Sequence, residues 1–126
     1  MIAPQNVRAL HPMRVLLVTD DERFATSVAV AAALQRVPLA HVRTADDLDA
    51  IAAQHKPNVV VFDARGAPRR ISRCASAYAT LHPRAAVVLV TNDSRVRTVS
   101  GLRLVPKRTA ERLLDELELA YLGVVA

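Results

Sequence analysis

The sequence has 126 residues, a length that suits one domain with one core and is short for two. Hydrophobic residues make up 52% and charged residues 23% of it, a globular balance with no apolar run near the ~20 residues of a membrane span, and its single cysteine excludes an intrachain disulfide and a cysteine-rich zinc site. The net charge of +5 comes mainly from arginine, which keeps nucleic acid and other phosphate-bearing partners under consideration.

The N-terminal segment MIAPQNVRALHPM (1–13) contains two prolines and no apolar stretch of signal-peptide length. We expect a flexible leader over 1–13, one domain over 14–122 and a short C-terminal end over 123–126. Without a secretion signal in this segment, we expect a cytoplasmic protein.

Short β-branched segments alternate with longer segments rich in alanine and leucine, which is typical of βα units around a parallel sheet. The five predicted strands are RVLLVT (14–19), LAHVRT (39–44), NVVVFD (58–63), AAVVLV (85–90) and LRLV (102–105). The first, third and fourth are nearly all apolar, which predicts helices on both faces of the sheet, whereas 39–44 alternates and is expected at an edge. The pattern predicts a three-layer (βα)5 sandwich.

Helical periodicity occurs between these strands. The segment 22–37 has apolar residues at near-helical spacing, and 44–56 opens with Thr44 three residues before Asp47, which is similar to a capping box. Further helices are predicted over about 69–81 and over 109–122, which carries an apolar stripe. The connection 92–101 has room for only about two helical turns, so we expect the fourth helix to be short or irregular.

Polar residues follow several of the predicted strands at their carboxyl ends, where open parallel sheets bind ligands. They are Thr19, Asp20, Asp21 and Glu22, then Asp63, then Thr91 and Asn92, and finally Lys107. Carboxylates from two adjacent strands repel one another, and Mg²⁺, which prefers oxygen ligands, relieves that repulsion. A nearby lysine and a threonine hydroxyl suit an added phosphoryl group. Asp20 and Asp21 also suit a second role, as caps of the helix that follows them.

Four segments in this order resemble the receiver domain of bacterial two-component response regulators. They are VLLVTDDE for its acidic-pair strand, VVVFD for its phosphoacceptor strand, VVLVT for its switch strand and LVPK for its lysine strand. The resemblance covers about residues 14–122 and implies a flavodoxin-like receiver topology with a five-stranded parallel sheet. It also implies a signal-transduction module that is not an enzyme, except for its own aspartyl phosphorylation and dephosphorylation.

The resemblance implies a role for each residue at the sheet edge. Asp63 would accept a phosphoryl group from a histidine kinase, a phosphotransfer protein or a small phosphodonor. Asp21 and Asp63 would bind Mg²⁺ directly, Asp20 would bind it through water, and the backbone carbonyl of Arg65 would be a further ligand.

Two more residues would then act on the phosphoryl group itself. Thr91 would hydrogen-bond to it and Lys107 would pair with its charge, because phosphoryl transfer relies on positioning and electrostatic stabilisation. The modified module would change its association with a downstream protein partner.

Departures from the family pattern leave a second function open. The small residue that usually follows the switch threonine is Asn92 here, the usual aromatic residue of the last strand is Leu104, and proline precedes Lys107 instead of following it. The alternative is a phosphorylation-independent pseudo-receiver that serves as a protein interaction module, with a homodimer left open.

Two interpretations also remain for the arginines that follow Asp63, which are Arg65, Arg69, Arg70 and Arg73. They form either a solvated helix face or a basic rim that guides an acidic partner toward Asp63. Direct nucleic-acid binding is disfavoured, because the chain has only four aromatic residues, at least two of them in core-like patterns, and so lacks a stacking platform.

Overall fold

The computed structural model describes residues 13–107 and 109–125. The elements in chain order are β1 (Val15–Val18), α2 (Glu22–Leu34), β2 (Leu39–Val42), the 3₁₀ turn η1 (Ala45–Asp47), α3 (Leu48–His55), β3 (Val59–Asp63), α4 (Pro68–Leu81), β4 (Ala86–Thr91), β5 (Arg97–Val99), β6 (Leu102–Pro106) and α5 (Ala110–Val125). The four longer predicted helices and the five predicted strands are all present, with ends that shift by a few residues.

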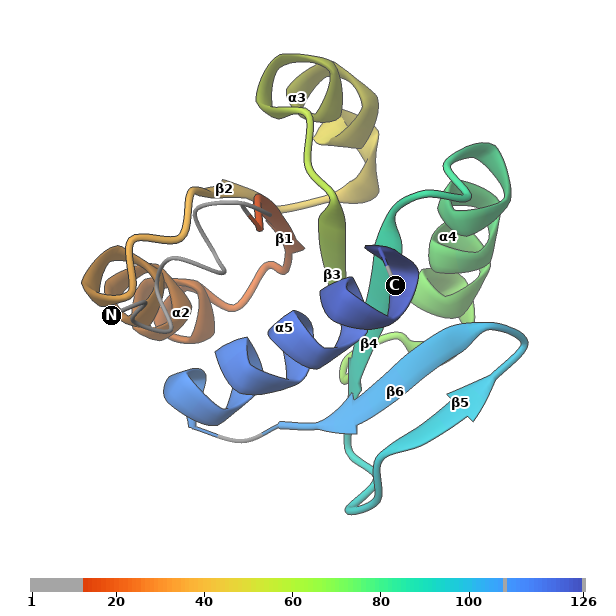
Figure 1. Ribbon diagram of the computed structural model, residues 1–126. Coiled ribbons are helices and arrows are strands. Elements are labelled where there is room, and N and C mark those ends of the chain that lie inside the picture. The colour runs from red at the N-terminus through yellow and green to blue at the C-terminus, as the bar shows by residue number, and fades with distance from the viewer. Residues whose placement is uncertain (1–12, 108, 126) are drawn as a thin grey trace.

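One mixed sheet forms the middle layer of the molecule (Figure 1). Its strand order is β2-β1-β3-β4-β6-β5, so the prediction that 39–44 lies at an edge is confirmed. All pairs are parallel except β5 with β6. From β1 the chain turns to β2 on one side and then crosses to β3 on the other, which places the reversal of strand order between β1 and β3.

Apolar side chains alternate between the two faces of the sheet and fill two cores. Leu17, Val61 and Val88 pack with α2 and α5 on one face. Val60 and Phe62 pack with α3 and α4 on the other face. Burial on both faces explains why the central strands contain almost no polar residues. The three-layer fold class predicted from the sequence is confirmed.

Residues 92–101 differ from the prediction, because they contain no helix. They form β5 instead, which pairs antiparallel with β6 and gives the sheet six strands rather than five. Ser100 and Gly101 join the two strands with φ values of 51° and 80°. Two consecutive positive φ values suit the tight turns that match the twist of a hairpin, and glycine adopts them easily. The short connection therefore closes as a hairpin, and the expectation of a short fourth helix was wrong.

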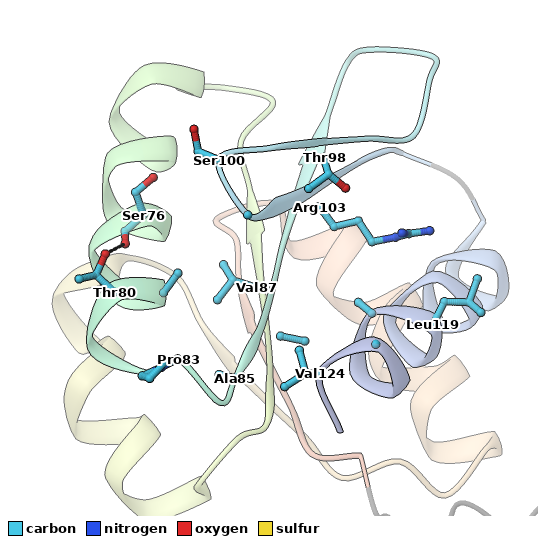
Figure 2. Close-up of a pocket in the computed structure, with 15 residues that line it drawn as sticks. Ser76, Thr80, Pro83, Ala85, Val87, Thr98, Ser100, Arg103, Leu119 and Val124 are labelled. Atoms are coloured by element: carbon cyan, nitrogen blue, oxygen red, sulfur yellow. Dashed lines mark hydrogen bonds between the residues drawn. The ribbon is translucent and has the colours of Figure 1, made fainter. Parts of the chain in front are cut away.

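The hairpin leaves a groove beside α4 and the end of α5 (Figure 2). Its volume is ≈ 840 Å³, and its walls include Thr80, Val87, Thr98 and Leu119. Val87 belongs to the first half of β4, so the groove opens away from the carboxyl ends of the strands. No helix within the described part of the chain is long and apolar enough to span a membrane.

The ends of the predicted domain need one adjustment each. Met13 is buried in the core beside α2 and α5, although the sequence placed it in the leader, and residues 1–12 lie outside the described residues. At the other end, α5 continues to Val125, past the predicted domain end at 122.

Candidate functional site

Asp63 and Thr19 meet at the carboxyl edge of the sheet. The parallel register pairs Val18 of β1 with Phe62 of β3, so the next residue of each strand lies beside the other. Thr19 is buried, and its hydroxyl donates a hydrogen bond of 2.7 Å to Oδ2 of Asp63. The same hydroxyl oxygen accepts the backbone N–H of Asp21 at 3.1 Å. Thr19 thus fixes both the carboxylate and the turn that leads into α2.

Arg65 folds back over Asp63 and binds it with two parallel hydrogen bonds. Its Nε donates to Oδ1 at 2.8 Å, and its Nη2 donates to Oδ2 at 2.8 Å. Nη2 also donates to Oδ2 of Asp21 at 3.0 Å. This fork is the geometry in which arginine binds a carboxylate most strongly. We call the three connected side chains of Arg65, Asp63 and Asp21 the Arg65 bridge.

The backbone around the bridge explains why Arg65 points inward. Ala64 still donates its N–H to Val90 at 2.8 Å, so the chain leaves the sheet only after that residue. The N–H of Arg65 then donates to Oδ1 of Asp63 at 3.2 Å, which closes a tight turn over the carboxylate. The guanidinium lies 4.8 Å from the centre of the Phe24 ring, a cation–π distance.

All three groups of the bridge favour their charged forms. Burial raises the pKa of Asp63, but hydrogen bonds from Arg65 and Thr19 outweigh this and hold that pKa below its ordinary value. The backbone N–H of Phe24, followed by Arg65, lowers the pKa of Asp21. The hydrogen bond to Asp63 raises the pKa of Arg65 further. The bridge is therefore an ion pair at neutral pH.

Asp21 is also the N-cap of α2, since its Oδ1 accepts the N–H of Phe24 at 3.0 Å. The capping role expected for it is therefore present, although its second oxygen points to Arg65. Asp20 is exposed, and it lines a different space, a cavity of ≈ 210 Å³ that also includes Asp63, Arg43 and Arg70. The structure thus separates two neighbouring acids that the sequence grouped together.

The remaining predicted residues lie around this centre. Thr91 ends β4, and its hydroxyl oxygen accepts the N–H of Asp93 at 3.2 Å, while its carbonyl accepts the N–H of Lys107 at 3.3 Å. Lys107 is exposed and shares a cavity of ≈ 240 Å³ with Asp21, whose pKa its charge lowers. The structure thus places Lys107 beside Asp21.

The predicted metal ligands do not fit a divalent ion in this arrangement. The guanidinium of Arg65 stands between Asp21 and Asp63, and the carbonyl of Arg65 already accepts a hydrogen bond of 3.3 Å from Asn92. Within residues 13–107 and 109–125, no group of three or more acidic, histidine or cysteine side chains is placed to hold a metal. The role of these residues toward Mg²⁺ stays a prediction.

Two contacts of the candidate site were not predicted from the sequence, namely those that the Arg65 side chain and the Thr19 hydroxyl make with Asp63. The sequence assigned only the backbone carbonyl of Arg65 to the metal site itself. An arginine two residues after a strand-terminal aspartate was the available signal, because such a side chain can fold back over the carboxylate. Arg65 was also predicted to belong to the solvated face or basic rim, and this is wrong, because its side chain is only 18% exposed and bound to Asp63. The other three arginines of that prediction, Arg69, Arg70 and Arg73, are exposed on α4.

No protein-family profile matches the chain, and no curated protein matches it in sequence. Solved structures do match. A response regulator receiver domain protein (CheY-like) from Methanospirillum hungatei has a TM-score of 0.71 at 16% identity, covering 90% of this chain and 96% of that one. The signal receiver domain of a putative LuxO repressor protein from Vibrio parahaemolyticus has a TM-score of 0.69 at 18% identity, covering 90% and 92%. The receiver domain of NtrC4 from Aquifex aeolicus has a TM-score of 0.68 at 15% identity, covering 90% and 99%. The chain therefore has the fold of response regulator receiver domains, as the four strand-end segments predicted.

Proposed function

We propose that this chain is a signal-transduction receiver module that acts by associating with a protein partner, without phosphorylation of Asp63. The Arg65 bridge is the observation that carries this proposal. The receiver fold supports a signalling role, and the bridge bears on how the role is performed. Under this proposal the protein is a binding module and turns over no substrate.

A phosphoacceptor carboxylate needs a free oxygen that can approach phosphorus in line, with cations arranged around the transferring group. The two oxygens of Asp63 instead accept four hydrogen bonds, one from Thr19 and three from Arg65. The side chain of Asp63 is only 7% exposed. An attack on phosphorus would first have to break part of this network in a nearly buried position.

A second candidate function is phosphoryl acceptance on Asp63, from a histidine kinase, a phosphotransfer protein or a small phosphodonor. The cavity of ≈ 210 Å³ beside Asp63 favours it, because Arg43 and Arg70 contribute to the lining and guanidinium groups suit phosphate oxygens. The neighbouring strand also ends in Thr91, one residue beyond the partner of Asp63 in the register. Asp20, Asp21 and Lys107 keep the roles implied by the family resemblance only under this candidate, which requires Arg65 to leave its present position.

Intact mass separates the two candidates. The protein is incubated with acetyl phosphate or phosphoramidate, with and without Mg²⁺, and the mass is read promptly because acyl phosphates hydrolyse. We expect no gain for the wild type or for Asp63→Asn. A gain of one phosphoryl group that needs both Mg²⁺ and Asp63 would contradict the proposal and establish the second candidate.

A further inference from the structure

We infer that the guanidinium of Arg65 is the resident cation of the acidic edge, and that it takes the place between Asp21 and Asp63 that a divalent ion would need. Wild-type protein then has no Mg²⁺ site at these two carboxylates, and removal of the Arg65 side chain creates one. The inference rests on the geometry of the same three side chains as the proposed function, but it concerns metal binding alone and is tested without a phosphodonor.

The positions of the donor atoms carry the first step. Nη2 of Arg65 lies 2.8 Å from Oδ2 of Asp63 and 3.0 Å from Oδ2 of Asp21. It therefore occupies the place from which one cation contacts both carboxylates. Mg²⁺ would need those oxygens at about 2.0–2.1 Å, with further ligands around it in an octahedron. The guanidinium and the ion cannot use the same two oxygens from the same place.

The second step concerns how firmly Arg65 is held. Its side chain is 18% exposed, and it contacts Asp63 through two nitrogens, Asp21 through one, and the face of Phe24. Its own backbone adds the hydrogen bonds to Asp63 and from Asn92. The guanidinium is planar, so its N–H donors are already arranged for these acceptors, and the side chain loses little entropy when it binds them. The side chain is thus built into the site.

Charge gives the third step. The two carboxylates of the bridge are paired with Arg65, and Lys107 shares a cavity with Asp21, so two positive side chains already face these two negative ones. A divalent ion added to this set would meet two positive side chains and no spare carboxylate of the bridge. Loss of Arg65 leaves two carboxylates close together, and their repulsion favours a bound cation.

The variants Arg65→Ala and Arg65→Gln remove the guanidinium, and Arg69→Ala is the matched control, because it removes the same charge from an exposed position on α4. Mg²⁺ affinity is measured by calorimetry, and the melting temperature is compared with and without millimolar Mg²⁺. We expect no saturable binding and no shift for wild type and Arg69→Ala. For both Arg65 variants we expect saturable binding that is at least about tenfold tighter than any weak binding by the wild type, because charge-assisted hydrogen bonds of this kind no longer compete. Adding Asp21→Asn to either variant should remove the gain.

A second measurement needs no variant. Paramagnetic Mn²⁺ is titrated into wild-type protein while the backbone amide signals are followed by NMR. Unchanged signals for Asp21 and Asp63 support the inference, and selective broadening of both at low Mn²⁺ would overturn it. Folded Arg65 variants that bind Mg²⁺ no better than wild type would overturn it as well. These readouts concern metal binding alone, so they separate this inference from the phosphorylation test.

Discussion

Arg65 and the arginines of α4 follow one another closely in the chain, yet they have opposite surroundings. Arg65 is mostly buried and bonded to Asp63 and Asp21. Arg69 and Arg73 are exposed on the helix surface. The difference comes from the backbone, because the chain turns sharply after Ala64 and directs Arg65 back toward β1. Identical side chains therefore act as a fixed counter-ion in one place and as a solvated charge in the other.

The largest expected effect compares these two positions directly. Arg65→Ala leaves two carboxylates without their cation, and breaking a buried ion pair in this way costs about 3–5 kcal/mol when the pair is fully buried. Asp21 is partly exposed, so we expect a loss of about 2–3 kcal/mol in the free energy of unfolding. Urea unfolding at neutral pH measures it.

Arg69→Ala is the control for that loss, and we expect it to change the free energy of unfolding by about 0.5 kcal/mol or less. Equal effects of the two substitutions would mean that the Arg65 bridge contributes no more than a surface charge.

The dependence of folding stability on pH tests the same comparison between Arg65 and Arg69. The pKa values of Asp63 and Asp21 lie below their ordinary values in the folded protein, mainly through hydrogen bonds that their charged forms accept. A carboxyl group of this kind stabilises the fold above its unfolded pKa of about 3.9, and that contribution is lost as the pH falls through the lower, folded value. Wild-type stability should therefore decline as the pH falls below about 4.

The variants test the cause of that decline. Arg65→Ala removes hydrogen bonds that lower both pKa values, so its stability should depend less on pH in this window, whereas Arg69→Ala should follow the wild type. Urea unfolding repeated between neutral pH and about pH 3 measures the slopes. Parallel slopes for all three proteins would show that the bridge does not govern the acid response.

The sequence predicted where the candidate site lies better than it predicted the contacts between the side chains of that site. Apolar runs that end in polar residues locate Asp63 and Thr19 at one sheet edge, because parallel strands bring their carboxyl ends together. The direction of the Arg65 side chain depends on the turn at residues 63–65, and no periodic pattern encodes such a turn. The prediction of a short helix over residues 92–101 was wrong for a similar reason. The structure of this segment depends on two positive φ values, at Ser100 and Gly101, which form the turn of a hairpin.

Thr19 gives the smallest effect, and a second threonine supplies its control. Thr19→Val keeps the shape of the side chain but removes the 2.7 Å hydrogen bond to Asp63 and the acceptor of the Asp21 N–H. Thr80→Val removes an exposed hydroxyl that donates to the carbonyl of Ser76 on α4. Hydrogen bonds to charged groups contribute more than neutral ones, and a buried partner left unpaired adds to the loss.

We therefore expect a loss of about 1–2 kcal/mol in the free energy of unfolding for Thr19→Val and about 0.5 kcal/mol or less for Thr80→Val. Urea unfolding of both variants measures the difference. Because the three hydrogen bonds from Arg65 to Asp63 remain in Thr19→Val, its loss should also be smaller than that of Arg65→Ala. The opposite order would mean that Thr19, and not the guanidinium, holds the carboxylate in place, and that the cation is secondary in this site.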